Sequence, residues 1–188
     1  FISSSNVFDS FTNFPSYEED KTFSRSLFGR FNIHIENKIL RMKNKNWSIN
    51  RSAMIFGKKS KRIVQIMESV SKNEAIEIFP NLIVNINSEQ QFAKQLHYII
   101  SRKLNGIFHH GSKDLINHEE LIKLIISLLK IKECNFKYVF TTNENRHLSL
   151  LSKKNKFPNH LNFDYESIPV SYTHLRAHET PEHRVWRR

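Results

Sequence analysis

Cysteine and glycine are scarce in this chain of 188 residues, which holds one Cys and four Gly. The lone Cys134 cannot form an intrachain disulfide, and the sequence offers no CxxC pair for zinc or for thiol redox chemistry. The four glycines lack the spacing of the Gly-rich strand–turn–helix unit that binds dinucleotides. No stretch of 18 apolar residues exists to span a membrane. We therefore expect a cytoplasmic protein with no metal site and no membrane partner, which should not bind a dinucleotide tightly by itself.

Positive charge is abundant, with a formal net charge of +11 at pH 7. A basic protein can bind nucleic acid through phosphate contacts. The lysines are scattered, however, and the one dense run, residues 58–62 (KKSKR), is short enough to be a solvated loop and helix start. We do not expect nucleic acid as a partner, and a basic nucleic-acid-binding protein is the weakest of the alternatives.

The last nineteen residues differ in composition from the rest. Residues 1–169 hold every Lys, Asn, Ile and Phe of the chain, and residues 170–188 hold none. Residues 171–180 (SYTHLRAHET) also resemble a known translation of sequencing-adapter DNA. His174 and His178 have the i, i+4 spacing of zinc ligands on a helix, but there is no HExxH pattern and Pro181 interrupts. We assign one domain to residues 1–169 and a non-native, disordered tail to residues 170–188.

Helical and strand-like patterns alternate along residues 1–169. Apolar residues recur every four positions over residues 27–39, which predicts a helix whose packing stripe is Leu27, Phe31, Ile35 and Ile39. Further helices are predicted over residues 63–70 and from the capping residues Ser88 and Asn117. Strand-like runs are residues 1–4, 47–55, 75–79, 82–86, 106–110 and 136–141, and residues 142–169 are expected to be mostly irregular. The alternation predicts an α/β fold with a largely parallel sheet.

Several motifs follow one another in the order of a known family. Residues 1–9 (FISSSNVFD) resemble the strand-end motif ISTDYVFD of the dTDP-4-dehydrorhamnose reductases, which are extended short-chain dehydrogenases. Residues 15–20 (PSYEED) resemble the acidic loop before the catalytic helix of that family. Residues 28–32 (FGRFN) stand where the family has Tyr-Gly-x-x-Lys. Residues 51–57 (RSAMIFG) and 106–114 (GIFHHGSKD) resemble two later strand ends.

The resemblance implies a particular part of the family fold. Residues 1–169 would be a partial NAD(P)-dependent sugar-nucleotide reductase or epimerase-like domain. They would contain the C-terminal part of a Rossmann-like doubly wound sheet and the smaller substrate-binding region, without the N-terminal Gly-rich unit. The family implies NAD(P) as cofactor and a sugar nucleotide as ligand.

The resemblance also places three catalytic positions. In the family a tyrosine gives a proton to the substrate oxygen, and a lysine one helical turn later lowers the pKa of that tyrosine. Phe28 occupies the tyrosine position and Asn32 the lysine position, so both functions are lost. Ser4 stands at the third position and keeps its hydroxyl. General acid catalysis contributes roughly 10²–10⁴-fold to a rate, so we expect turnover to be nearly abolished.

Further polar residues are candidates for substrate binding. Arg51 at a strand end is either a surface charge or a contact to a substrate phosphate, and Tyr17 and Glu18 belong to the acidic loop. His109 and His110 alternate along a strand, so at most one of them can face a site, and a structural role is favoured for both.

Two readings of function from the same fold follow. The first is a sugar-nucleotide-binding, oxidoreductase-like protein, related to the NAD(P)H-dependent reduction of dTDP-4-dehydrorhamnose and inactive as this fragment. The second is a non-enzymatic binding or regulatory module. Whether the protein is an enzyme is not settled by the sequence, and a homo-oligomer is left open.

Overall fold

The computed structural model describes residues 1–9, 12–57, 60–153 and 157–168. The predicted tail of residues 170–188 lies outside them. The main helices are α1 (Leu27–Leu40), α2 (Lys61–Ser71), α3 (Glu89–Ser101) and α4 (His118–Leu128). The strands are β1 (Ile2–Ser4), β2 (Ser48–Ser52), β3 (Met54–Phe56), β4 (Ile76–Ile78), β5 (Leu82–Val84), β6 (Ile86–Ser88), β7 (Gly106–His110), β8 (Ile116–Asn117), β9 (Phe136–Tyr138) and β10 (Arg146–Leu148). Three 3₁₀ turns are η1 (Ser5–Val7), η2 (Asn159–Leu161) and η3 (Tyr165–Ser167).

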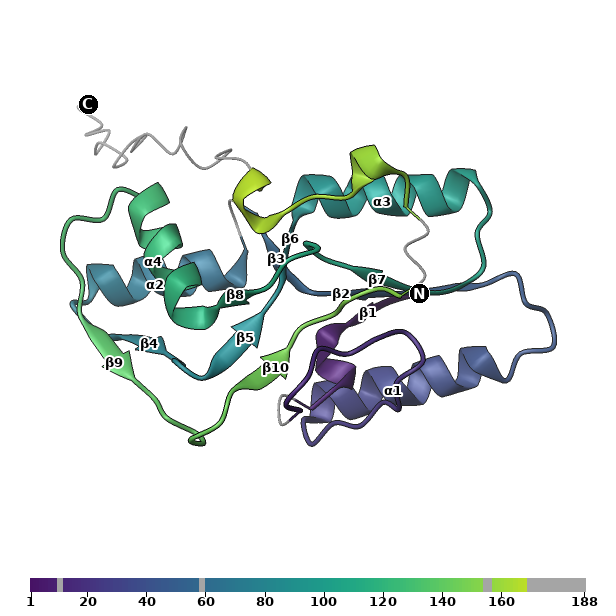
Figure 1. The fold of residues 1–188 in the computed structure, drawn as a ribbon, viewed down its shortest axis with the longest axis horizontal. Helices are drawn as coiled ribbons and strands as arrows, with labels where there is room; N and C mark the ends of the chain where they lie inside the picture. The colour runs from purple at the N-terminus through teal and green to yellow at the C-terminus, as the bar shows by residue number, and fades with distance from the viewer. Residues whose placement is uncertain (10–11, 58–59, 154–156, 169–188) are drawn as a thin grey trace, which may run out of the picture.

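Half of the molecule is built on a parallel sheet with the strand order β1-β2-β7. Helices α1 and α3 cover its opposite faces (Figure 1). Because successive side chains of a strand point to opposite faces, the row Ser3–Arg51–His109 lies on the side of α1. The neighbouring residue His110 contacts Gln95 of α3 at 3.0 Å. The expected α/β fold with a largely parallel sheet is confirmed.

The other half packs short strand pairs against α2 and α4 (Figure 1). The pairs β3–β6 and β4–β9 are parallel, and β5 lies between parallel β10 and antiparallel β8. The sequence predicted one strand over residues 47–55, but Ala53 separates β2 from β3, and the chain crosses there from the first half into the second. Residues 142–169, expected to be mostly irregular, contribute the strand β10.

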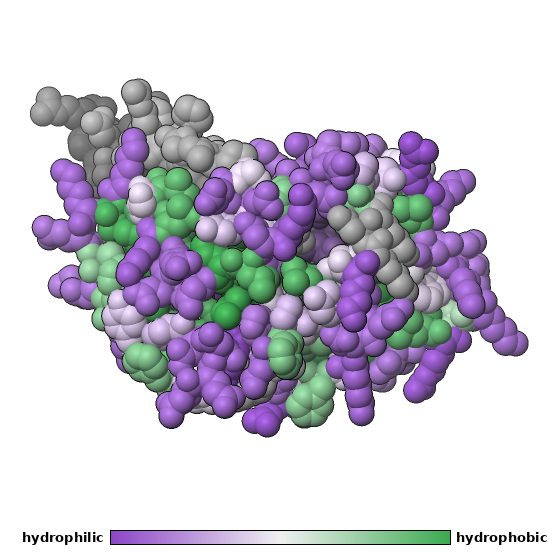
Figure 2. Space-filling model, in the orientation of Figure 1, coloured by the Kyte–Doolittle hydropathy of each residue, from purple (hydrophilic) through white to green (hydrophobic). Residues whose placement is uncertain are grey.

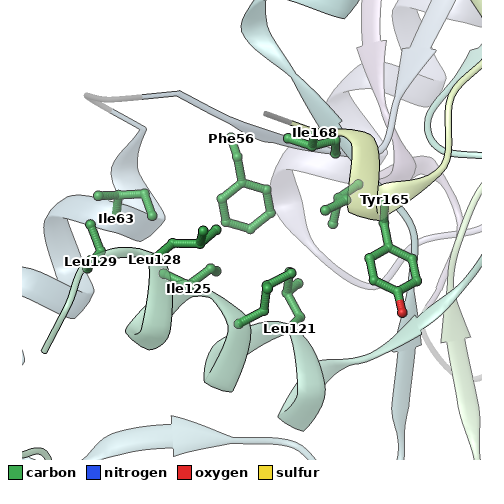
Figure 3. A pocket seen from close by; sticks show the side chains of 10 residues that line it. Phe56, Ile63, Leu121, Ile125, Leu128, Leu129, Tyr165 and Ile168 are labelled. Carbon is green, nitrogen blue, oxygen red and sulfur yellow. The ribbon is translucent and has the colours of Figure 1, made fainter. Parts of the chain in front are cut away.

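The largest apolar core lies in this second half, and apolar surface gathers over it in Figure 2. Figure 3 shows a small space inside that core, between Phe56, Ile63, Leu121 and Tyr165. Its free volume of about 30 Å³ would hold about one water molecule, and its walls are almost wholly apolar. Spaces of that kind stay dry, so this one is a packing gap and not a ligand site.

The buried amide of Asn85 links the two halves. Asn85, between β5 and β6, is fully buried. Its Nδ2 donates hydrogen bonds to the carbonyl oxygens of Ser112 (3.0 Å) and Leu150 (2.6 Å), and its Oδ1 accepts one from Leu150 N at 2.9 Å. The Asn85 side chain thus satisfies the backbone N–H and C=O of Leu150, as a neighbouring strand would. It also holds this segment, which follows β10, beside Ser112 after the end of β7.

The packing face of α1 differs from the expected one. The predicted stripe included Leu27 and Phe31, but these side chains are 78% and 59% exposed. The buried residues of α1 are instead Gly29, Asn32 and Glu36. The prediction of the stripe was wrong because the sheet face beneath α1 is polar, carrying Ser3, Arg51 and His109, and it therefore takes the polar side of the helix.

Candidate functional site

The end of β1 and the start of α1 meet directly. Ser4, which keeps the predicted hydroxyl, ends β1 and its Oγ accepts a hydrogen bond from Asn6 N at 3.2 Å. Gly29 of α1 lies so close to η1 that a Cβ at this position would be 2.1 Å from the carbonyl oxygen of Asn6. This glycine brings the neighbouring Phe28 to the turn that Ser4 begins.

Phe28 and Asn32 occupy different surroundings on α1. Phe28 is 56% exposed. Its side chain has no hydroxyl and cannot donate a proton. Asn32 is only 4% exposed, and its Nδ2 has no hydrogen-bond partner among the described residues. Ser3 Oγ, on the sheet face that α1 covers, is also buried without a described partner. The helix and the sheet therefore enclose two unsatisfied polar groups, of which Asn32 is at a predicted catalytic position and Ser3 is the neighbour of another, Ser4. The catalytic roles stay a prediction.

Arg51 is held in a buried ion pair. Its guanidinium is about 2% exposed and contacts the Glu36 carboxylate through Nη2 at 2.7 Å and through Nε at 3.1 Å. Its Nη1 donates to the carbonyl oxygen of Glu18 at 3.2 Å. A buried charge needs such partners, since removal from water is costly. These contacts give Arg51 a structural task, and its predicted contact with a substrate phosphate is not tested by them.

His109 joins the same network in a defined tautomer. Arginine can only donate, so His109 Nε2 accepts from Arg51 at 3.3 Å, and Nδ1 donates to the carbonyl oxygen of Leu151 at 2.9 Å. The pKa of His109 is lowered to about 4, mainly by burial and also by the nearby charge of Arg51. The ring is therefore neutral at pH 7 and fixes the segment after β10 to the sheet.

Tyr17 and Glu18 lie at the edge of this network. The Glu18 carboxylate accepts hydrogen bonds from Ser152 Oγ and from Lys153 N, and Lys153 Nζ lies 4.6 Å from the centre of the Tyr17 ring. Tyr17 and His109 line a cavity of about 270 Å³ with polar and apolar walls. Glu18 thus contacts Arg51 through its carbonyl oxygen, and Arg51 is paired with Ser3, the neighbour of Ser4, across the sheet.

The residues present do not fit a dinucleotide. In a dinucleotide-binding turn, glycines allow close approach of the pyrophosphate. Here three of the four glycines are packed so closely against other residues of the chain that a Cβ would collide with them. The fourth, Gly106, adopts a positive φ of 116° at the start of β7. The nearest atoms to an added Cβ belong to Asn6 for Gly29, to the Glu89 carboxylate for Gly57 and to the Asn85 amide for Gly111.

The start of α2 has features of an anion site, although the sequence predicted a solvated loop and helix start there. Its N-cap residue, Ser60, makes no capping hydrogen bond, and Ser60 Oγ is buried without a described partner. The first turn carries Lys61 and Arg62 and no acidic residue, although helix N-termini favour negative charge. Free backbone N–H groups and basic side chains at a helix start suit a phosphate group. The basic run was the available signal.

Within the described ranges, no three His, Cys, Asp or Glu side chains gather as metal ligands. The histidines of the tail lie outside those ranges. None of the helices among the described residues has the length and apolar character needed to cross a membrane.

A protein-family comparison identifies the chain over most of its length. Residues 1–151 match the model of the RmlD substrate binding domain. The chain belongs to this family. No curated protein is similar enough in sequence to match the chain.

Solved structures share the fold at low sequence identity. A dTDP-4-dehydrorhamnose reductase from Clostridium acetobutylicum ATCC 824 is 18% identical with a TM-score of 0.68, over 88% of this chain and 61% of that one. The reductase from Bacillus anthracis str. Ames, in complex with NADP, is 20% identical with a TM-score of 0.66, over 80% of this chain and 55% of that one. The dTDP-glucose 4,6-dehydratase DesIV from Streptomyces venezuelae, with NAD and TYD bound, is 13% identical with a TM-score of 0.64, over 79% of this chain and 49% of that one. The chain spans about 60% of the length of the first of these reductases.

Proposed function

We propose that this protein binds a sugar nucleotide through the start of α2 and does not reduce it. The uncapped α2 N-terminus with buried Ser60 Oγ and basic Lys61 supports a site for the diphosphate. The start of α2 follows β3 along the chain, and β3 in turn follows β2 of the parallel sheet. The relatives are enzymes of sugar-nucleotide metabolism by their names, and that agrees with the ligand class.

The absence of turnover is supported by the residues at the α1 start. Phe28 has no hydroxyl, and the Asn32 amide has no charge with which to lower the pKa of a neighbouring proton donor. Gly29, Gly57 and Gly111 pack closely against other parts of the chain. These observations favour the non-enzymatic binding or regulatory module over a working reductase, for the chain of 188 residues. NAD(P) chemistry stays a property of relatives such as the NADP complex.

Thymidine diphosphate tests the binding site. We expect it to bind the 188-residue chain in isothermal titration, and we expect Lys61→Met to weaken binding about five- to tenfold, because a cation near a helix N-terminus and a bound phosphate interact by about 1 kcal/mol. The exposed Lys132→Met, with the same charge change beyond α4, is the control and should bind as the unmodified chain does. Equal affinities of the Lys61 and Lys132 variants would place the diphosphate elsewhere.

Restoring the two catalytic side chains tests the proposed loss of activity. In a longer version that carries a dinucleotide-binding unit, Phe28→Tyr with Asn32→Lys should raise NADPH oxidation with a dTDP-4-keto sugar by roughly 10²-fold or more, the usual contribution of general acid catalysis. Phe31→Tyr, an exposed ring on the same helix, is the matched control and should add nothing. If the double variant gains no more than the control, the assignment of positions 28 and 32 fails.

A further inference from the structure

A cavity of about 320 Å³ lies at the edge of the parallel sheet where β2 and β7 begin. Ser48 and Gly106, the first residues of these strands, pair with each other. The segment before β2 and the turn from α3 to β7 both line the cavity, and both lie at the right-hand end of the molecule in Figure 1. A volume of this size falls within the range of small-molecule sites.

The cavity is separate from the residues discussed so far. No residue of α1 or α2 lines it. Ser4 ends β1 and pairs with Ser52 at the end of β2, so the predicted catalytic position lies at the opposite edge of the sheet. A ligand in this cavity would therefore occupy a second site.

Trp47 brings an unused hydrogen-bond donor to the cavity wall. Its backbone is satisfied, since Trp47 N donates to the carbonyl oxygen of Lys45 at 2.9 Å and its own carbonyl oxygen accepts from Gly106 N at 3.0 Å. The indole Nε1, by contrast, is buried and has no acceptor among the described residues. An indole nitrogen can only donate, and a buried donor without an acceptor is costly. An acceptor on a bound molecule would remove this cost.

The surroundings of the cavity are positively charged. Lys103 lines the cavity, and none of its lining residues is acidic. The two loops that contribute to the wall, residues 41–46 (RMKNKN) and 101–105 (SRKLN), hold two Arg and three Lys, all exposed, and no Asp or Glu. A surface of one sign of charge attracts ligands of the other sign. The acceptor that suits Trp47 is therefore part of an anion.

Much of the remaining wall is apolar. Ile99 is buried, Leu104 packs against the core cluster that contains Ile99, and Ile100 is 71% exposed. The Trp47 ring adds a flat, half-buried apolar face. An inorganic anion would leave these side chains in water, whereas a ligand with a hydrocarbon part would remove them from it, which is favourable.

We propose that this cavity binds a small amphipathic anion, an alkyl or aryl carboxylate. One carboxylate oxygen accepts a hydrogen bond from Trp47 Nε1 and the carboxylate charge faces Lys103. The hydrocarbon part lies against Ile99, Ile100 and Leu104. A carboxylate suits the site better than a phosphate dianion, because Lys103 is the one cationic side chain in the wall among the described residues.

Octanoate is the probe, and the fluorescence of Trp47 is the local readout. The chain has two Trp, so the titration uses the full chain with Trp186→Phe, in which Trp47 alone emits. We expect a saturable change of this emission. Lys103→Met should weaken octanoate binding about threefold to fivefold, the effect of an exposed ion pair.

Lys130→Met is the matched control. Lys130 follows α4 as Lys103 follows α3, in the same left-handed backbone conformation, with φ of 55° and 51° respectively. Lys130 does not line the cavity, so its variant should bind octanoate as the unmodified chain does. Equal weakening by the two variants, or no saturable binding of octanoate, overturns the proposal.

Two further titrations separate the carboxylate from the hydrocarbon. Trp47→Phe keeps an aromatic ring without the N–H, and in isothermal titration it should weaken octanoate binding about tenfold or more, since hydrogen bonds to charged groups are strong. 1-Octanol has the same chain length without the charge and should bind more weakly than octanoate, with equal affinity for the unmodified chain and Lys103→Met. Octanol that binds as tightly as octanoate would reduce the site to an apolar hollow and contradict the proposal. These results leave the binding of thymidine diphosphate to the start of α2 untouched.

Discussion

Replacing Arg51 with methionine should destabilise the protein by about 3–5 kcal/mol, because it leaves the Glu36 carboxylate buried without its cation. Both side chains are about 2–3% exposed and lie 2.7 Å apart. The variant also removes the donor to His109 Nε2 and to the Glu18 carbonyl oxygen. Since whole domains are stable by roughly 5–15 kcal/mol, we expect a large fall in the urea midpoint, or a chain that no longer folds.

A double variant shows whether the pair is the cause. Arg51→Met with Glu36→Leu removes both charges, and buried ion pairs can be replaced by apolar residues at little cost. We expect the double variant to be clearly more stable than Arg51→Met alone. Arg41→Met, an exposed arginine after α1, should change the free energy of unfolding by less than about 0.5 kcal/mol. A double variant as unstable as Arg51→Met would mean that packing, not the unpaired carboxylate, dominates.

Lowering the pH from 7 to 5 should also destabilise the protein strongly, through three buried histidines. Burial lowers the pKa to about 4 for His109, about 3 for His110 and about 4 for His118. Because these folded-state pKa values lie below the unfolded value near 6.5, the unfolded chain takes up more protons between pH 6.5 and 4. Stability is complete above pH 6.5 and falls with pH in that window, by about 2 kcal/mol for each histidine down to pH 5.

Urea unfolding in phosphate-free buffer at half-unit steps of pH measures this effect. We expect a total loss on the order of 6 kcal/mol between pH 7 and pH 5. His110→Gln should reduce the pH dependence by about one proton, since glutamine keeps hydrogen-bonding groups but does not titrate. The exposed His34→Gln should leave the pH dependence as it is. A free energy of unfolding that is flat from pH 7 to pH 5 would show that these rings titrate normally.

Much of the fold was readable from local patterns. Ser88 and Asn117 were predicted as helix starts, and their side chains accept the capping hydrogen bonds from Gln91 N and Glu119 N. Such caps depend on neighbouring residues only. The alternation of strands and helices likewise predicted the parallel pairing, and the ordered motifs predicted the family that the match over residues 1–151 shows.

The environment of particular side chains could not be predicted in the same way. The exposed Leu27 and Phe31 follow a helical period, but which face is buried depends on the polar row of the sheet that α1 meets. Arg51 finds Glu36 fifteen positions away, and Asn85 finds Leu150 sixty-five positions away. Contacts of that separation leave no local periodicity in a single sequence. The roles predicted for Ser4, Phe28, Asn32, Tyr17 and Glu18 stay predictions, as does a homo-oligomer.

The basic run of residues 58–62 is a weak sequence signal that the structure divides. A short basic run is usually a solvated surface. Ser60 makes no capping hydrogen bond and Lys61 is exposed, whereas Arg62 is half-buried and lines a surface cavity. The sequence contained both residues but not the division between them.

The most direct test is to titrate dTDP-L-rhamnose and NADPH, in separate cells, onto one preparation of the 188-residue chain. The account predicts saturable heat with the sugar nucleotide and none with the dinucleotide. Tight binding of NADPH, or no binding of dTDP-L-rhamnose at any concentration reached, would contradict it.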